Sequence, residues 1–216
     1  MDETVYFFDV DNTLLDNDAV AADLRGHLAQ EFGPIRQQRY WDEYERLRDE
    51  LGYADYLGAL QRFRVAFPHD THLLSISDWL IDYPFADRLY PLVPEVVDAI
   101  RARGRPVILS DGDVVFQPRK VRRSGLADAF REDVLIYIHK EQELDDAQRR
   151  YPAERYVLVD DKVRILAAVK DLLGDRVTTV FVRQGHYALD PEIEARYPPA
   201  DVTVERIGDL LDVPSL

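Results

Sequence analysis

No cysteine occurs among the 216 residues, which excludes disulfides, thiolate nucleophiles and zinc sites built on cysteine. None of the five histidines belongs to a metal-ligand pattern such as HExxH. Apolar runs are short, and none approaches the roughly 18 residues that a membrane span needs. The sequence therefore argues against thiol chemistry and against a membrane-spanning helix.

Basic residues are also few, since 27 Lys and Arg stand against 41 Asp and Glu and give a formal charge of −14. Such an acidic surface argues against non-specific binding to nucleic acids or anionic membranes. It does not exclude an anionic substrate, because a bound divalent metal can invert the local field. The acidic start, with Asp2 and Glu3, differs from the basic start of a signal peptide, so we expect a cytoplasmic location.

Hydrophobic residues make up 46% of the chain, enough for the core of one domain or of one domain with an insertion. Short apolar runs predict five strands, at 4–10, 106–111, 133–138, 155–160 and 177–182. Continuous rather than alternating apolar runs are typical of strands buried on both faces. Helical patterns at 94–104 and 163–174 lie between them. We therefore predict an α/β fold with a doubly wound, mostly parallel sheet.

The segment 17–88 breaks this alternation. It shows no convincing strand but has amphipathic helical patterns at 18–33, 37–52 and 53–67. Because the segment is far longer than an ordinary crossover, we predict an all-helical insertion, with the core formed by 1–16 and 89–216. The alternative is a set of helices that cover the sheet. The aromatic residues of the segment are expected mainly to pack between helices, with one or two touching a substrate: Tyr40, Trp41, Tyr44, Tyr53, Tyr56 and Phe63.

Chemically active side chains gather at the ends of four predicted strands. They are Asp9 and Asp11, Ser110, Lys140, and Asp160 with Asp161. Because the carboxyl ends of parallel strands share one edge of a sheet, we expect these side chains to converge. Asp9 and Asp11 point the same way on an extended chain, and two like charges so placed favour a cation between them. Carboxylates hold a hard cation, while a hydroxyl and an ammonium group hold a phosphate, so we predict a Mg²⁺ site beside a phosphate site.

With these motifs in this order, the chain resembles the haloacid dehalogenase-like (HAD) hydrolase superfamily. The sequence DVDNT at 9–13 resembles the first motif of that family, DxDx[TV]. Ser110 resembles the second motif, Lys140 the third, and Asp160-Asp161 one form of the fourth. The resemblance covers roughly 1–16 and 88–185, and a helical cap inserted after the first motif is a known layout of the family.

The resemblance implies a role for each of these residues. Asp9 would be the nucleophile that forms an aspartyl-phosphate, and Asp11 would be the general acid, while its backbone carbonyl binds the metal. Ser110 and Lys140 would bind the transferring phosphoryl oxygens. The metal ligands would be Asp9, Asp11 and Asp161. Asp160 would orient Lys140 or a metal-bound water, although the roles of Asp160 and Asp161 could be exchanged.

Two features depart from the family pattern or extend it. Lys140 is followed by Glu141 rather than the common proline, so Lys162 is a second candidate for the third motif. The SDGD sequence at 110–113 places Asp111 and Gly112 on the possible substrate side of the site, or in a simple turn that ends the strand. His139 and His186 are expected to be structural.

The implied function is a Mg²⁺-dependent phosphatase that acts on a small phosphorylated metabolite. The first alternative is a haloacid dehalogenase, in which the nucleophilic aspartate attacks carbon and which needs neither a metal nor an acid at Asp11. The second is a non-catalytic binding module on the same fold. Phosphomutase activity stays open, whereas a phosphonatase would need a lysine in the insertion, and 17–88 contains none. The sequence does not indicate the substrate or the oligomeric state.

Overall fold

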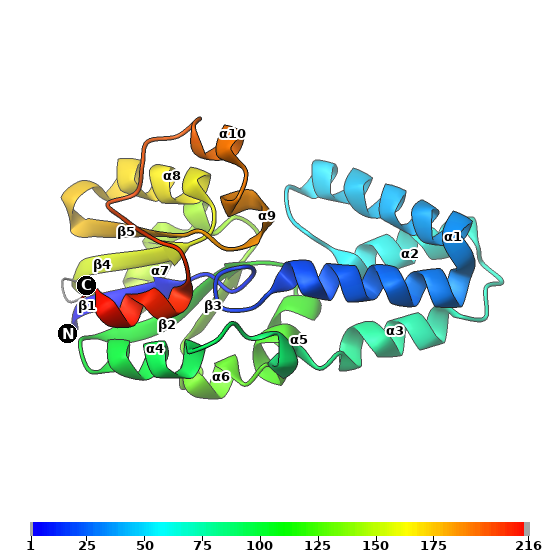
Figure 1. Cartoon of the computed structure of the whole chain (residues 1–216), viewed down its shortest axis with the longest axis horizontal. Helices are drawn as coiled ribbons and strands as arrows, with labels where there is room; N and C mark the ends of the chain where they lie inside the picture. The colour runs from blue at the N-terminus through cyan, green and yellow to red at the C-terminus, as the bar shows by residue number, and fades with distance from the viewer. Residues whose placement is uncertain (1, 214–216) are drawn as a thin grey trace.

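A computed structural model describes residues 2–213 and shows an α/β fold (Figure 1). Within these residues, six strands form one parallel sheet with the order β3-β2-β1-β4-β5-β6. The strands are β1 (Asp2–Phe8), β2 (Arg105–Asp111), β3 (Val134–Tyr137), β4 (Ala153–Asp160), β5 (Val177–Val182) and β6 (Val202–Val204). The predicted parallel sheet and its five strands are confirmed, and β6 was not predicted.

The central strand β1 shows why a continuous apolar run builds this sheet. Tyr6 and Phe8 belong to one hydrophobic cluster, while Val5 and Phe7 belong to the other. Successive side chains of a strand point to opposite faces, so one run serves two layers of helices. All four side chains are buried. On one face, Phe7 stacks on Tyr156 of β4 with 5.6 Å between the ring centroids.

Helices cover both faces of the sheet. One layer contains α4 (Val93–Arg101), α5 (Phe116–Arg123), α6 (Leu126–Ala129) and the 3₁₀ helix η4 (Ile207–Asp212); the other contains α7 (Leu144–Arg150), α8 (Val163–Leu173), α9 (Gly185–Ala188) and α10 (Pro191–Glu194). Three further 3₁₀ turns are η1 (Phe85–Arg88), η2 (Lys140–Gln142) and η3 (Gly174–Arg176). The predicted helices at 94–104 and 163–174 are confirmed as α4 and α8. In the described part of the chain, no helix has the length and apolar character to cross a bilayer.

Three helices form a lobe beyond the carboxyl ends of the strands (Figure 1). They are α1 (Asn17–Leu51), α2 (Tyr56–Ala66) and α3 (Leu73–Asp82). Helix α1 is broken at Gly33, where φ is 73°, and Pro34 follows. Glycine tolerates this conformation and proline cannot continue the preceding hydrogen bonding, so the second half of α1 folds back toward the sheet.

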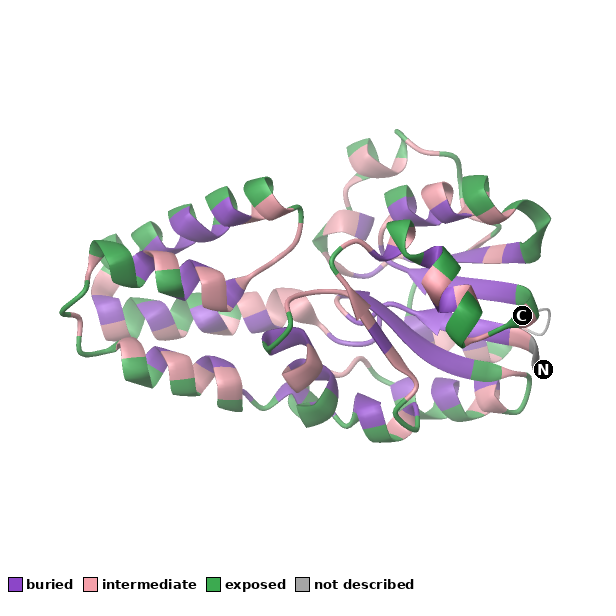
Figure 2. Cartoon of the chain, turned by 180° about the vertical axis from the view of Figure 1, so that it is seen from behind, coloured by how far each residue is buried: buried purple, intermediate pink, exposed green. Residues whose placement is uncertain are grey.

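Aromatic contacts hold the lobe together. Phe32 stacks on Phe63 with 4.6 Å between the centroids, and the hydroxyl group of Tyr40 donates to the carbonyl oxygen of Tyr56 at 2.9 Å. Buried residues lie mainly on the sides of the three helices that face one another (Figure 2). The lobe therefore has an apolar interior of its own that is continuous with one cluster of the sheet.

The two segments that join the lobe to the sheet lie side by side. Leu15 and Leu89 form an antiparallel bridge. The N–H of Asp16 donates to the carbonyl oxygen of Arg88 at 2.8 Å, and the N–H of Tyr90 donates to that of Leu14 at 3.0 Å. The chain therefore leaves and re-enters the core at one place, next to the loop that follows β1.

Candidate active site

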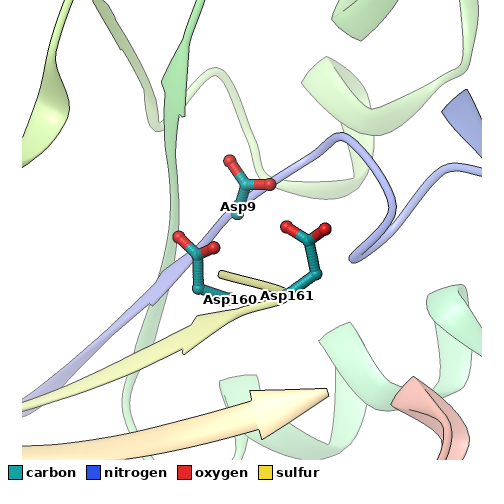
Figure 3. Close-up of side chains that lie close together, drawn as sticks. All are labelled: Asp9, Asp160 and Asp161. Carbon is teal, nitrogen blue, oxygen red and sulfur yellow. The ribbon is translucent and has the colours of Figure 1, made fainter. Parts of the chain in front are cut away.

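Asp9 and Asp160 become neighbours through the pairing of β1 with β4. In this parallel pair Phe8 lies opposite Val159, and the N–H of Asp9 donates to the carbonyl oxygen of Val159 at 3.0 Å. The next residue along each strand is therefore an aspartate, at the carboxyl edge where open α/β sheets bind ligands. Asp161 follows directly, and Figure 3 shows the three carboxyl groups close together.

The three aspartates form a compact set of oxygen donors. One carboxylate oxygen from each of Asp9, Asp160 and Asp161 lies within 4.8 Å of the others, and all three residues are buried. Among the described residues, Asp9 Oδ2, Asp160 Oδ2 and both carboxylate oxygens of Asp161 have no hydrogen-bond partner, although Asp160 Oδ2 forms an ion pair with Lys140. A buried carboxylate without partners carries a large desolvation cost. Because Mg²⁺ prefers oxygen ligands of this kind, the donor set fits the predicted metal.

The crowding of these carboxyl groups also affects their protonation. Burial raises the pKa of Asp160, although the ammonium group of Lys140 opposes this effect. Burial raises the pKa of Asp161 well above its usual range, and the charges of Asp160 and Asp9 add to the increase, while Lys162 opposes it. A cation placed among these carboxylates would offset their mutual repulsion.

Lys140 supplies the ammonium group of the site. It opens η2 after β3, it is 1% exposed, and its Nζ lies 2.5 Å from Asp9 Oδ1 and 2.6 Å from Asp160 Oδ2. Its backbone N–H donates to Asp111 Oδ1 at 2.7 Å. Burial disfavours the charged form, but the carboxylates of Asp160, Asp9 and Asp111 outweigh burial and raise the pKa of Lys140. The side chain therefore stays protonated next to Asp9.

The contacts of Asp160 and Asp161 differ. Asp160 Oδ1 accepts a hydrogen bond from the N–H of Lys162 at 2.8 Å, and Asp160 Oδ2 pairs with Lys140. Both oxygens of Asp161 lack a partner among the described residues. Asp160 is thus occupied by protein groups, whereas Asp161 is free to bind a cation.

This difference leads to a prediction about metal affinity. Asp161→Ala is expected to weaken Mg²⁺ binding more than Asp160→Ala does, because Asp161 is the candidate for a direct metal ligand. Asp160 instead orients Lys140, and removal of such a supporting group typically lowers metal affinity about 10- to 100-fold. Calorimetric titration with Mg²⁺ would measure both. Asp171→Ala, at an exposed position on α8, is the matched control and should bind Mg²⁺ normally. The reverse order for Asp160 and Asp161 would exchange their roles.

Ser110 and the two residues after it lie at the end of β2. Ser110 is buried, and its Oγ accepts a hydrogen bond from Gln117 Nε2 at 3.0 Å. Gly112 packs so closely on this glutamine that a Cβ atom at Gly112 would lie 2.5 Å from Gln117 Cβ. Asp111 holds the backbone of Lys140, and Asp111 and Gly112 line the cavity described below.

Asp11 lies outside the cluster of three aspartates. Its Oδ1 accepts from Lys120 Nζ at 2.6 Å, and its side chain is 22% exposed. Lys120 lies on α5 and was not predicted from the sequence. The available signal was a helical face formed by Phe116, Gln117, Lys120 and Val121, all of which are buried. These four residues share one face of the helix, and the signal is that a charged lysine lies on this face beside two apolar residues and a glutamine.

A cavity of about 790 Å³ lies between the lobe and this edge of the sheet. Residues of the lobe in its wall include Arg25, Trp41, Tyr44, Arg48, Tyr53 and Tyr56, and residues of the core include Asp11, Asp111, Lys120, Lys162, Tyr187 and Arg196. Four of the six lobe aromatics singled out in the sequence thus line the cavity. Tyr40 and Phe63 are instead fully buried within the lobe.

Two of the remaining candidates from the sequence, Lys162 and His186, line the cavity. Lys162 Nζ lies over the ring of Tyr187, 5.5 Å from its centroid, whereas Lys140 Nζ lies 2.5 Å from Asp9 Oδ1. Of the two candidates for the third motif, Lys140 is therefore the one that contacts Asp9. His186 Nδ1 lies 2.6 Å from Asp18 Oδ1, close to the start of α1. His139 packs on Gly52, where a Cβ atom would lie 2.7 Å from the imidazole Cε1. The end of α1 therefore touches the loop that carries Lys140.

Comparison with known families gives one match. The family model for the haloacid dehalogenase-like hydrolases matches residues 4–182. This span includes β1 to β5, the helical lobe and all the aspartates of the site. No curated protein sequence matches this chain significantly.

Several solved structures are similar to this chain. A protein described as a haloacid dehalogenase-like hydrolase from Burkholderia xenovorans LB400 is 62% identical, with a TM-score of 0.93 over 97% of this chain and 98% of the other. The L-2-haloacid dehalogenase of Xanthobacter autotrophicus is 20% identical, with a TM-score of 0.64 over the whole of both chains. The HAD-hydrolase YfnB of Bacillus subtilis, bound to magnesium, is 14% identical with a TM-score of 0.64, again over both whole chains. The last two similarities establish the fold alone.

Proposed function

This chain belongs to the haloacid dehalogenase-like hydrolase family, and we propose that it is a Mg²⁺-dependent phosphatase of a small phosphorylated metabolite. The observation that carries the proposal is the buried set of Asp9, Asp160 and Asp161. Three carboxylates face one directly bound ammonium group, that of Lys140. A phosphate dianion would add further negative charge, so the site requires a divalent cation to bind such a substrate.

The proposed metal ligands are the carboxylates of Asp9 and Asp161 and the backbone carbonyl of Asp11. Bound there, Mg²⁺ would neutralise charge on the phosphoryl oxygens and orient the phosphate. The buried oxygens of Asp9 and Asp161 that lack partners support this assignment. Asp160 would hold Lys140 in place through the contact at 2.6 Å.

The reaction would proceed in two steps. In the first, a carboxylate oxygen of Asp9 attacks phosphorus, the bond from phosphorus to the leaving oxygen breaks, and Asp11 gives its proton to that oxygen. In the second, Asp11 takes a proton from water, the water oxygen attacks phosphorus, and the bond to Asp9 breaks. Phosphate is released and both aspartates return to their first state. Lys140 and Ser110 would bind the phosphoryl oxygens during both steps.

The cavity supports a small substrate. Helices α1 and α2 and the α9–α10 region enclose about 790 Å³ above the sheet edge, and we propose that 17–88 acts as a cap that excludes macromolecules and bulk water. Cations such as Arg25 and Lys162 line this cavity although the chain carries a formal charge of −14. Arg25 lies over the ring of Trp41, 4.3 Å from its centroid. Such a wall suits a small anionic molecule.

Hydrolysis of carbon–halogen bonds is the second candidate, because L-2-haloacid dehalogenases are among the similar structures. In that reaction Asp9 would attack carbon, and a 2-haloacid brings a single carboxylate and no phosphate. Asp160 would still hold Lys140, but the carboxylate of Asp161, which has no hydrogen-bond partner among the described residues, and the carboxyl group of Asp11 would then have no chemical task. Asp161 and Asp11 therefore favour the phosphatase.

The deciding experiment measures two products from the purified protein with Mg²⁺. We expect phosphate release from p-nitrophenyl phosphate and from phosphorylated metabolites, and no chloride release from 2-chloropropionate. Chloride release without phosphate release would assign the dehalogenase reaction instead. Release of neither product from a folded protein would support the non-catalytic binding module.

A further inference from the structure

Helix α5 carries a buried lysine that the proposed reaction does not yet use. Lys120 is 1% exposed, and its Nζ lies 2.6 Å from Asp11 Oδ1 and 2.9 Å from Asn17 Oδ1. A buried ammonium group is costly unless it is paired, and an apolar residue of similar volume would often be as stable. The position of this lysine is therefore better explained by its partners than by stability.

The neighbours of Lys120 on the helix are arranged around the site as well. Lys120 lies one turn after Phe116, with its Nζ 5.3 Å from that ring centroid. Residues four apart share one face of a helix. The same face carries Gln117, which donates to Ser110 Oγ at 3.0 Å. One face of α5 thus contacts two residues of the site. The amide of Gln117 binds Ser110, and the ammonium group of Lys120 binds Asp11.

Asn17, the second partner, is the first residue of α1. Its backbone N–H donates to Asn12 Oδ1 at 3.0 Å, and Asn12 has a left-handed backbone with φ 61° in the loop after β1. Lys120 therefore joins the loop that carries Asp11 to the point where the lobe begins. A displacement of α1 relative to the sheet would move one of the two oxygens that hold this ammonium group.

The solvent side of α5 is joined to the other end of the lobe. Arg119 Nε donates to the carbonyl oxygen of Ile81 at 2.7 Å, and its guanidinium pairs with Asp82 at 2.8 Å. Arg123 donates to the carbonyl oxygen of Asp82 at 2.7 Å. Helix α5 consequently contacts both ends of the lobe, α1 through Lys120 and α3 through these two arginines.

We propose that Lys120 is a positioning residue for Asp11. Because Lys120 also binds Asn17, the position of Asp11 depends on how the lobe packs against the core. This inference rests on the proposed phosphatase reaction, in which Asp11 protonates the leaving oxygen. Lys120 forms and breaks no covalent bond in either step. It fixes a carboxyl group that is 22% exposed and would otherwise turn toward solvent. The proton transfer is then available only when the lobe is in place.

The test compares leaving groups in single-turnover reactions, which report the chemical step. Lys120→Met and Asp11→Asn are each expected to slow an alkyl phosphate more than p-nitrophenyl phosphate, because the aryl leaving group needs less protonation. For Lys120→Met the additional loss on the alkyl ester should be roughly 10- to 100-fold, the effect of misplacing a reacting group by about 1 Å. KM should change little. The double variant should lose no more than Asp11→Asn alone.

Three further variants complete the design. Lys120→Arg keeps the charge and should restore part of the rate on the alkyl ester. Lys170→Met removes a lysine whose Nζ lies 2.8 Å from Asp201, far along α8 from the site, and should leave both rates unchanged. Asn17→Ala should show the same leaving-group bias as Lys120→Met, but smaller. If Lys120→Met does not fold, the bias in Asn17→Ala decides the proposal.

The outcomes separate this inference from the function on which it rests. Three results would overturn the positioning role and leave the phosphatase in place. Lys120→Met could slow both esters equally, it could change KM alone, or the double variant could show the product of the two single rate losses. No bias in Asn17→Ala would overturn the link to the lobe. If the wild-type protein released no phosphate from either ester, the proposed function and this inference would fall together.

Discussion

The Asp9→Asn variant is expected to lose turnover of every phosphate ester that the wild-type protein hydrolyses. An asparagine amide cannot form the covalent intermediate, and removal of a nucleophile costs up to about 10⁶ in rate in other hydrolases. In contrast to Asp11→Asn, the loss should not depend on the leaving group. Steady-state rates with aryl and alkyl phosphates would show this. Acid-quenched protein should carry a phosphoryl group in the wild type and none in the variant.

The fold of this variant is expected to survive. Asparagine has nearly the same shape as aspartate, and Lys140 keeps its contact with Asp160 at 2.6 Å. The substitution also removes one of three crowded carboxylates. Asp128→Asn, at an exposed position on α6, is the matched control and should keep full activity. Substantial turnover by folded Asp9→Asn would show that another group is the nucleophile.

Removal of divalent cations is expected to abolish phosphatase activity, and Mg²⁺ should restore it. Without the cation, a phosphate dianion would have to enter beside Asp9 Oδ2 and both oxygens of Asp161, which have no hydrogen-bond partner in the described part of the chain. Dialysis against EDTA followed by addition of Mg²⁺ would test this. Full turnover of the phosphate ester in excess EDTA would contradict the Mg²⁺ dependence of the proposed reaction.

A second measurement follows metal binding without any substrate. A ligand that binds only the folded protein stabilises it by about 2.7 kcal/mol at a concentration of 100 Kd. The midpoint of thermal unfolding should therefore rise with Mg²⁺ in the wild-type protein. The rise should disappear in Asp161→Ala. An equal rise in both proteins would place the metal elsewhere.

The parts of the fold that could be predicted were those specified by local sequence. The apolar run at 4–10 predicted a buried strand, and Pro94 and Gly174 marked the start of α4 and the end of α8. Strand β6 could not be found this way, because it has three residues and pairs with β5 alone. The separate helical patterns predicted at 18–33 and 37–52 correspond to the two halves of α1 on either side of its break at Gly33. Local signals of this kind need no knowledge of tertiary contacts.

The convergence of the candidate side chains was predictable for a related reason. Asp9, Ser110, Lys140 and Asp160 all lie at or just beyond the end of a strand, and the geometry of a parallel sheet brings such ends together. Lys120 follows no strand. It reaches Asp11 from the face of a helix, and only the packing of α5 against the loop after β1 and the start of α1 reveals the contact. Helical spacing likewise could not separate cavity-facing Trp41 from interior Tyr40.

The position of β1 in the middle of the sheet has a consequence for how the protein is made. Phe8 pairs with Ile108 on one side and with Val159 on the other, so β1 is synthesised well before either of its partner strands leaves the ribosome. Long-range parallel pairing of this kind is slow and leaves apolar edges exposed while it is incomplete. A nascent chain that has not reached β4 holds Asp9 but lacks Asp160 and Asp161. The cluster of aspartates therefore forms only after β4 has been synthesised, and a shorter chain lacks two of the three carboxylates of the proposed metal site.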